Sequence, residues 1–389
     1  MSLSGLMLAQ WAGKLRALRN RVNRGVRALA AIVATACGVS FHDVPRGGAN
    51  DVADYLGGPT RAATATERVD TAPGRVWRVT AGRGTLGAVA MGERVTAIAT
   101  VDRWVYLLDS RSGRVLWRYR GDAPYGAGPV IGFGRVFAAS EGRDGRISAI
   151  DLRSGKRKWS ARVGDVGSPL TLADSSIYGV TQSGEAFAYA AGSGKRRWVR
   201  IVGPSRSGAL VTPSRVVVVT LTDSLFVLDR ATGAIVTRAL LGASTIAPLA
   251  LVGDSAVALS SPGGAIVLAS LSGTVRWRRP TGAPVFGSPV VIGDTIFAVT
   301  TRCTLWAIPA SDPAGADSAS LGCNTVAPPA LVRDGVLVAT VTGDVIYYDR
   351  ARRRRVWTRA AKGELRQPPA ILHGQIIVAP AIGDVVSFR

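Results

Sequence analysis

The sequence predicts an all-β fold, an eight-bladed β-propeller whose blades are four-stranded antiparallel sheets. Short β-rich runs end in a small residue at positions 100, 140, 181, 220, 260, 300, 340 and 380, a spacing of 39 to 41 residues. A second run often ends in aspartate, followed by a Ser/Thr-Gly turn and then tryptophan, as from Asp109 to Trp117. A further strand is often opened by proline, at Pro129, Pro169, Pro289, Pro329 and Pro369. Four short strands in each forty residues are typical of a propeller blade.

The two ends of the repeat region predict how the ring closes. Val385 to Arg389 match a third strand, and no fourth strand follows them. The missing strand matches residues 74–79, where Trp77 continues the tryptophan series. We therefore expect the N-terminal strand to complete the last blade and to remove its free edge. The predicted propeller spans residues 71–389.

The N-terminus resembles an export signal. Six basic residues between positions 14 and 27 precede a short apolar run at 28–34, and Ala34-Thr35-Ala36 fits a cleavage site. The sequence thus predicts a signal peptide at residues 1–36. Cys37 occupies the lipidated position of a lipobox, although an incidental cysteine after ordinary cleavage is the alternative. Residues 37–70 are predicted to be a lipid-anchored flexible tether.

The other two cysteines are Cys303 and Cys323. They flank a predicted hairpin centred near Pro313, where an antiparallel register would place them opposite each other. A disulfide is predicted if the compartment is oxidising, and two buried thiols are the alternative.

Composition and charge narrow the function classes. The net charge of +22 favours an acidic protein, an anionic membrane surface or nucleic acid as partner, unless it only reflects an arginine-rich composition. The two histidines, His42 and His373, lie far apart, which disfavours a histidine metal site or a Ser-His-Asp triad. The sequence predicts no catalytic residues, no metal site and no cofactor.

Basic residues cluster in three predicted turns between third and fourth strands. Equivalent turns emerge on one face of a propeller, so these residues could form a basic ring that docks a partner, or simply a solvated rim. Because no aromatic platform is interleaved with them, nucleic acid is not the expected partner. The residues are Lys156, Arg157, Lys158, Lys195, Arg196, Arg197, Arg352, Arg353, Arg354 and Arg355.

One tryptophan recurs in most repeats. We interpret this series as packing between blades, with substrate stacking as the alternative. Thr237 stands in its place once, the sixth repeat lacks it, and Trp104 and Trp306 fall outside the register as candidates for an exposed contact. The series comprises Trp77, Trp117, Trp159, Trp198, Trp277 and Trp357.

The unit Asp-x-x-Ser/Thr-Gly-x-x-x-Trp, as in Asp109–Trp117, Asp151–Trp159 and Asp349–Trp357, resembles the quinoprotein-type (PQQ-like) propeller repeat. Within that superfamily the length, leader, cysteine and compact repeats resemble the BamB family. This resemblance implies a non-catalytic, monomeric lipoprotein scaffold of the outer-membrane β-barrel assembly machinery. It would face the periplasm and bind a BamA-like subunit.

The quinone-dependent dehydrogenases are the alternative branch. They are longer, insert large loops, and carry an adjacent cysteine pair and acidic calcium ligands. Here Cys303 and Cys323 are not adjacent and the connections are short. The sequence therefore favours a scaffold. A PQQ-dependent dehydrogenase-like enzyme, or a propeller that binds another anionic or cell-envelope partner, remains open.

Overall fold

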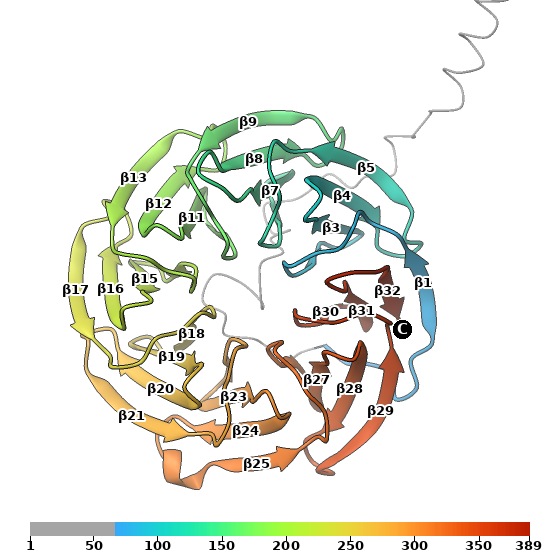
Figure 1. The fold of residues 1–389 in the computed structure, drawn as a ribbon, viewed down its shortest axis with the longest axis vertical. Helices are drawn as coiled ribbons and strands as arrows, with labels where there is room; N and C mark the ends of the chain where they lie inside the picture. The colour runs from blue at the N-terminus through green and yellow to red at the C-terminus, as the bar shows by residue number, and fades with distance from the viewer. Residues whose placement is uncertain (1–66) are drawn as a thin grey trace, which may run out of the picture. The chain divides into compact units, whose positions relative to one another are not determined.

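In the computed structural model, residues 67–389 are described. They form eight four-stranded antiparallel sheets, arranged as the blades of a propeller (Figure 1). The predicted fold class is therefore confirmed. The predicted signal peptide, Cys37 and the tether up to residue 66 lie outside the described residues.

Each blade runs from an inner first strand to an outer fourth strand. Blades 1 to 4 contain β2 (Ala90–Met91), β3 (Val95–Ala99), β4 (Trp104–Asp109) and β5 (Val115–Arg120); β6 (Val130–Gly132), β7 (Arg135–Ala139), β8 (Arg146–Asp151) and β9 (Arg157–Arg162); β10 (Thr171–Ala173), β11 (Ser176–Val180), β12 (Glu185–Ala190) and β13 (Arg196–Ile201); and β14 (Leu210–Val211), β15 (Arg215–Val219), β16 (Ser224–Asp229) and β17 (Ile235–Leu240).

Blades 5 to 8 follow the same order, with one 3₁₀ turn, η2 (Pro313–Gly315), in blade 6. They contain β18 (Ala250–Val252), β19 (Ala256–Ser261), β20 (Ala265–Ser270) and β21 (Val275–Pro280); β22 (Val290–Ile292), β23 (Thr295–Val299), β24 (Thr304–Pro309) and β25 (Asp317–Ser320); β26 (Ala330–Val332), β27 (Gly335–Ala339), β28 (Asp344–Asp349) and β29 (Arg354–Ala360); and β30 (Ala370–Leu372), β31 (Gln375–Val378), β32 (Val385–Phe388) and β1 (Arg75–Val79).

The hydrophobic core lies between neighbouring blades. Second and third strands are buried on both faces, as in β15 and β16, because a blade packs against a neighbour on each side. One core cluster, for example, joins Tyr178 and Val180 of blade 3 to Val216 and Phe226 of blade 4. Fourth strands alternate between half-buried and exposed residues, as in β21, because one of their faces meets solvent.

The N-terminal strand closes the ring. β1 pairs with β32, and Gly74 and Arg389 exchange two backbone hydrogen bonds of 2.9 Å. Glu67 also accepts a hydrogen bond from the Arg333 amide at 2.9 Å, so the chain contacts the propeller before the predicted boundary at residue 70. Residues 67–70 belong to the closure and not to a tether.

In blades 1, 2, 4 and 7 the turn after the third strand is built by an aspartate. In blade 2, Asp151 accepts hydrogen bonds from the Ser154 amide at 2.8 Å and from its hydroxyl at 2.7 Å. Gly155 follows with φ of 66°, and a Cβ there would collide with the Trp117 indole of blade 1. Glycine is required here because the turn needs a positive φ and because a side chain would collide with the neighbouring tryptophan.

At six seams a recurrent tryptophan joins one blade to the next. Trp117 donates its indole N–H to the Leu152 carbonyl at 2.8 Å, and Trp198 donates to the Arg230 carbonyl at 2.9 Å. The other four make the same bond, with acceptors Ser110 for Trp77, Ala191 for Trp159, Ala310 for Trp277 and Asp70 for Trp357. Asp70 thus supplies from the N-terminal segment the acceptor that blade 8 lacks.

Two of the eight seams lack this tryptophan. At the seam between blades 6 and 7, Asp317 forms an ion pair with Arg353 instead. At the seam between blades 4 and 5, Thr237 and Ala239 face Gly273, and no indole bridges the blades. Blade 4 is therefore joined to blade 5 mainly through apolar packing.

Candidate partner-binding surfaces

The propeller presents two faces of different construction. On the tight-turn face, the turn between first and second strands is bonded to the turn after the third strand. Examples are Leu152 N–H to Gly134 O at 2.9 Å and Arg230 N–H to Ser214 O at 3.0 Å. The loop face carries the connections between blades and the turns between second and third strands. Strand alternation within every blade places these two sets of segments at opposite ends.

The predicted basic residues lie on the tight-turn face of blades 2, 3 and 7, where they are exposed. They form two clusters and not a continuous ring. The blade 5 turn, Leu271 to Thr274, carries no charge, and the blade 6 segment carries Asp312 and Asp317. The expected ring of basic side chains is therefore interrupted at blades 5 and 6.

Most basic side chains of the blade 7 cluster already pair with groups of the protein itself. Arg352 pairs with Asp349 at 2.9 Å, Arg353 pairs with Asp317, and Arg355 donates to the Leu321 carbonyl. In blades 2 and 3, by contrast, Lys156, Arg157, Lys195 and Arg196 are exposed side chains close to the turn tips. Blades 2 and 3 thus offer the more accessible positive charge.

The turn aspartates are structural carboxylates. Burial of Asp151 favours its neutral form, but hydrogen bonds from Ser154 and the ammonium of Lys158 outweigh this and lower its pKa. The Thr232 hydroxyl likewise lowers the pKa of Asp229. A carboxylate with a lowered pKa is a weaker base, and its oxygens already accept several hydrogen bonds, so it is poorly suited to act as a general base.

On the loop face, the eight inter-blade connections converge on the axis of the ring (Figure 1). They line a shallow cavity of 130 Å³. Leu86, Ile246 and Phe286 are each more than a third exposed at its rim, beside Arg206 and Arg366. Gly87 packs so closely against Gly128 that a Cβ would not fit. This close packing keeps the entrance of the cavity narrow, and we call this entrance the axial mouth.

This mouth does not fit a quinone cofactor held by calcium. Its volume is well below the roughly 300–1,000 Å³ of pockets that hold such ligands. The lining contains glycine, apolar, basic and two neutral polar residues, Ser288 and Gln367, but no carboxylate. Within residues 67–389, no three His, Cys, Asp or Glu side chains are grouped so that they could hold a metal ion.

The two tryptophans outside the repeat register do not offer free aromatic faces. Trp104 is half-buried, with the guanidinium of Arg118 4.8 Å and that of Arg120 5.6 Å from its ring centre. Trp306 lies in the same way under Arg279 at 5.4 Å. Arginines of the fourth strand therefore cover both rings.

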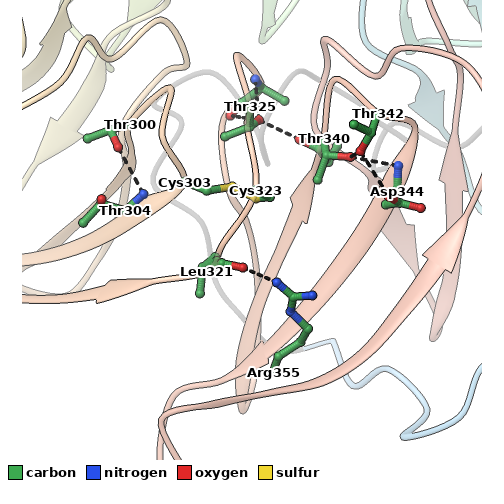
Figure 2. The surroundings of a disulfide bond; sticks show 12 residues. Thr300, Cys303, Thr304, Leu321, Cys323, Thr325, Thr340, Thr342, Asp344 and Arg355 are labelled. Carbon is green, nitrogen blue, oxygen red and sulfur yellow. Dashed lines mark hydrogen bonds between the residues drawn. A yellow bond between two sulfur atoms is a disulfide. The ribbon is translucent and has the colours of Figure 1, made fainter.

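Cys303 and Cys323 form a disulfide, with Cα atoms 5.2 Å apart (Figure 2). The predicted register is wrong, because Thr304 pairs with Ser320 and the Leu321 amide donates to the Cys303 carbonyl. The hairpin is therefore centred one residue earlier than predicted. The disulfide ties the turn before β24 to the connection after β25, beyond the end of the strand ladder.

We expect the double variant Cys303→Ala/Cys323→Ala to lose about 3 kcal/mol of unfolding free energy, since the bridge closes a loop of 20 residues. Chemical denaturation followed by circular dichroism measures this loss. A reductant should shift the wild-type midpoint equally and leave the variant unchanged. A wild-type midpoint that does not respond to reductant would contradict the prediction.

Comparison with known proteins decides the family. The model of the family described as outer membrane protein assembly factor BamB matches residues 66–164, 160–239 and 222–316, well over half of the chain. The chain belongs to the BamB family. No curated protein matches the sequence.

Solved structures agree with the BamB fold. The crystal structure of BamB from Moraxella catarrhalis has a TM-score of 0.68 and 16% identity, covering 82% of this chain and 98% of that one. Quinohemoprotein alcohol dehydrogenase from Comamonas testosteroni gives 0.67 and 12%, covering 91% and 84%. A computationally designed protein, Ika8, gives 0.65 and 12%, covering 81% and 99%. At such identities these matches establish the fold alone.

Two surface features were missed by sequence reasoning. The rim of the axial cavity draws one short segment from every blade, so no local motif marks it. The outer strand of blade 4, β17, exposes Ile235, Val236 and Leu240. A signal for it was present, since blade 4 replaces the tryptophan with Thr237 in an apolar fourth strand.

Among residues 67–389, no helix has the length and apolar character to cross a bilayer.

Proposed function

We propose that this protein is a non-catalytic scaffold of the outer-membrane β-barrel assembly machinery, with a BamA-like subunit as its partner. The observation that carries the proposal is the BamB family match over residues 66–316. The site chemistry supports it, because the axial mouth is small and the turn aspartates are already hydrogen-bonded. A rigid ring of short loops is suited to holding a protein partner in a fixed orientation.

The proposed location is the periplasmic side of the outer membrane, reached through a lipid on Cys37. Its support is the leader with Ala34-Thr35-Ala36 directly before Cys37. The monomeric propeller would then be tethered to the membrane without a transmembrane helix. The exposed basic residues of blades 2 and 3 could orient it toward acidic proteins or lipid headgroups.

A mild-detergent pull-down of the tagged full-length protein from its own membranes tests the function. We expect a β-barrel protein with periplasmic domains to co-purify in stoichiometric amount. Cys37→Ser is the matched control for the anchor, and it should move the protein to the soluble fraction while the purified proteins still associate. Recovery of a bound quinone or a cytochrome, with no barrel protein, would replace the scaffold by the dehydrogenase-like alternative.

A further inference from the structure

Within residues 67–389, the outer strand of every blade is an edge strand with one unpaired backbone side. Such edges attract other β-strands, and proteins protect them with charge, proline or short length. β1, β5, β9, β13, β21 and β29 each carry at least two basic residues, and β25 has only four residues. β17, with the sequence IVTRAL, carries a single charge.

That single charge does not cover the edge. The guanidinium of Arg238 lies 5.4 Å from the ring centre of Phe226, on the flank of its own blade. Ile235, Val236 and Leu240 are 46%, 51% and 76% exposed. β17 is therefore an edge strand of six residues on which three apolar side chains are exposed.

The backbone of β17 is available at defined positions. The Leu241 amide donates to the Asp223 carbonyl at 2.8 Å, so residues 239 and 241 bond toward β16. In an antiparallel ladder the alternate residues, Arg238 and Leu240, then turn their N–H and C=O groups outward. In blade 5 the Thr281 amide makes the equivalent hydrogen bond, to the Gly264 carbonyl at 2.9 Å. Thr281 therefore corresponds to Leu241, and Pro280 corresponds to Leu240. Blade 5 thus lacks the outward donor that blade 4 keeps.

Two more exposed apolar side chains lie at the loop-face ends of blades 4 and 3. The Leu221 amide donates to the Pro204 carbonyl at 2.7 Å, which ties the second-to-third-strand turn of blade 4 to the connection after β13. Leu221 is 40% exposed, and Ile201, at the end of β13, is 75% exposed. We call Ile235–Leu240, together with Leu221 and Ile201, the blade-4 edge.

Positive charge flanks this edge on both sides. Arg200 of blade 3 donates to the Gly233 carbonyl at 2.9 Å, and Arg278 of blade 5 donates to the Gly242 carbonyl at 2.7 Å. A second copy of this chain would bring its own excess of basic over acidic residues to the contact and be repelled. An acidic partner would be attracted.

We propose that the blade-4 edge binds an extended segment of an acidic partner protein, which adds to β17 as a fifth strand. Backbone hydrogen bonds to Arg238 and Leu240 supply affinity, and apolar side chains on alternate positions of the segment contact Val236 and Leu240. The proposal rests on the scaffold function and adds to it the docking strand and the chemistry of the partner.

Site-specific photo-crosslinking in the cell envelope of the source organism tests this proposal. The probe is a photoreactive amino acid placed at Arg238 of the full-length chain, with the equivalent outward position Thr358 of blade 7 as the matched control. We expect a discrete adduct at position 238 at least tenfold more abundant than at 358, with the crosslinked peptide mapping to an acidic protein. Equal adducts at both positions, none at 238, or an adduct only with a second copy of this chain overturns the proposal.

Backbone variants separate strand addition from side-chain contact. Leu240→Pro reproduces the residue that blade 5 carries at the equivalent position and removes the outward donor, so the adduct should fall at least tenfold. Ala360→Pro makes the same change on blade 7 and should leave the adduct unchanged. Leu240→Glu keeps the backbone donor and should also weaken an acidic partner, which provides a second test if the proline variant is unstable. An adduct that survives both Leu240 variants excludes strand addition at β17.

The result is distinguishable from failure of the proposed function. If a β-barrel protein co-purifies but position 238 gives no adduct, the scaffold function stands and the blade-4 edge is not its docking strand. If position 238 crosslinks to an acidic protein unrelated to barrel assembly, the docking role of the blade-4 edge is supported and the proposed function fails.

Discussion

Replacing Trp198 with alanine is expected to destabilise the propeller by about 3–5 kcal/mol, the usual cost of deleting a large buried aromatic side chain. Trp198 is only 7% exposed, its ring lies 6.2 Å from that of Tyr178, and its indole N–H bonds to blade 4. The variant leaves both a cavity at the seam and an unpaired carbonyl at Arg230. Equilibrium denaturation followed by circular dichroism measures the loss.

Trp198→Phe is the matched control for this experiment. It keeps an aromatic ring over Gly233 but loses the hydrogen bond, so we expect a smaller loss, of about 1–2 kcal/mol. If the alanine variant were as stable as the wild type, the tryptophan series would not hold the blades together. Stacking on a substrate or partner would then be the better explanation of the series.

Deleting residues 1–80 is expected to have a larger effect than any single substitution. It removes β1, the buried Trp77 and the segment that accepts the hydrogen bonds of Trp357 and Arg359. β32 then becomes an apolar free edge, which favours aggregation. We expect a loss above about 5 kcal/mol, together with soluble oligomers on size-exclusion chromatography.

Deletion of residues 1–66 provides the comparison. It removes the chain that precedes Glu67 and leaves every closure contact named above in place. This shorter truncation should unfold at the same denaturant concentration as the chain without its leader. Identical unfolding of the two truncations would show that the N-terminal strand does not close the ring.

The repeat architecture could be predicted from the sequence because the same pattern of strands and turns recurs from blade to blade. Short turns such as Asp151 to Gly155 depend on local hydrogen bonds, and the Trp117 that sits over Gly155 recurs at the same spacing in other blades. The pairing of β1 with β32 was also predictable, since the C-terminal repeat lacks one strand.

The features that escaped prediction depend on contacts between segments distant in sequence. The register of the Cys303 hairpin shifted because the turn around η2 sets the pairing of Thr304 with Ser320. The basic clusters could be located on one face, but not the ion pair that engages Arg353 with Asp317 of the next blade. The blade-4 edge emerges only when all eight outer strands are compared.

The closure by β1 also has a consequence for the timing of folding. β1 is made first and β32 last, about 300 residues later, so the ring cannot close before synthesis is nearly complete. At ribosomal rates of about 5–20 residues per second, β1 must wait about 15–60 seconds for its partner strand. Such a non-local contact also slows closure itself. For that interval the ring stays open, and the edge of β1 that will pair with β32 is accessible to a chaperone.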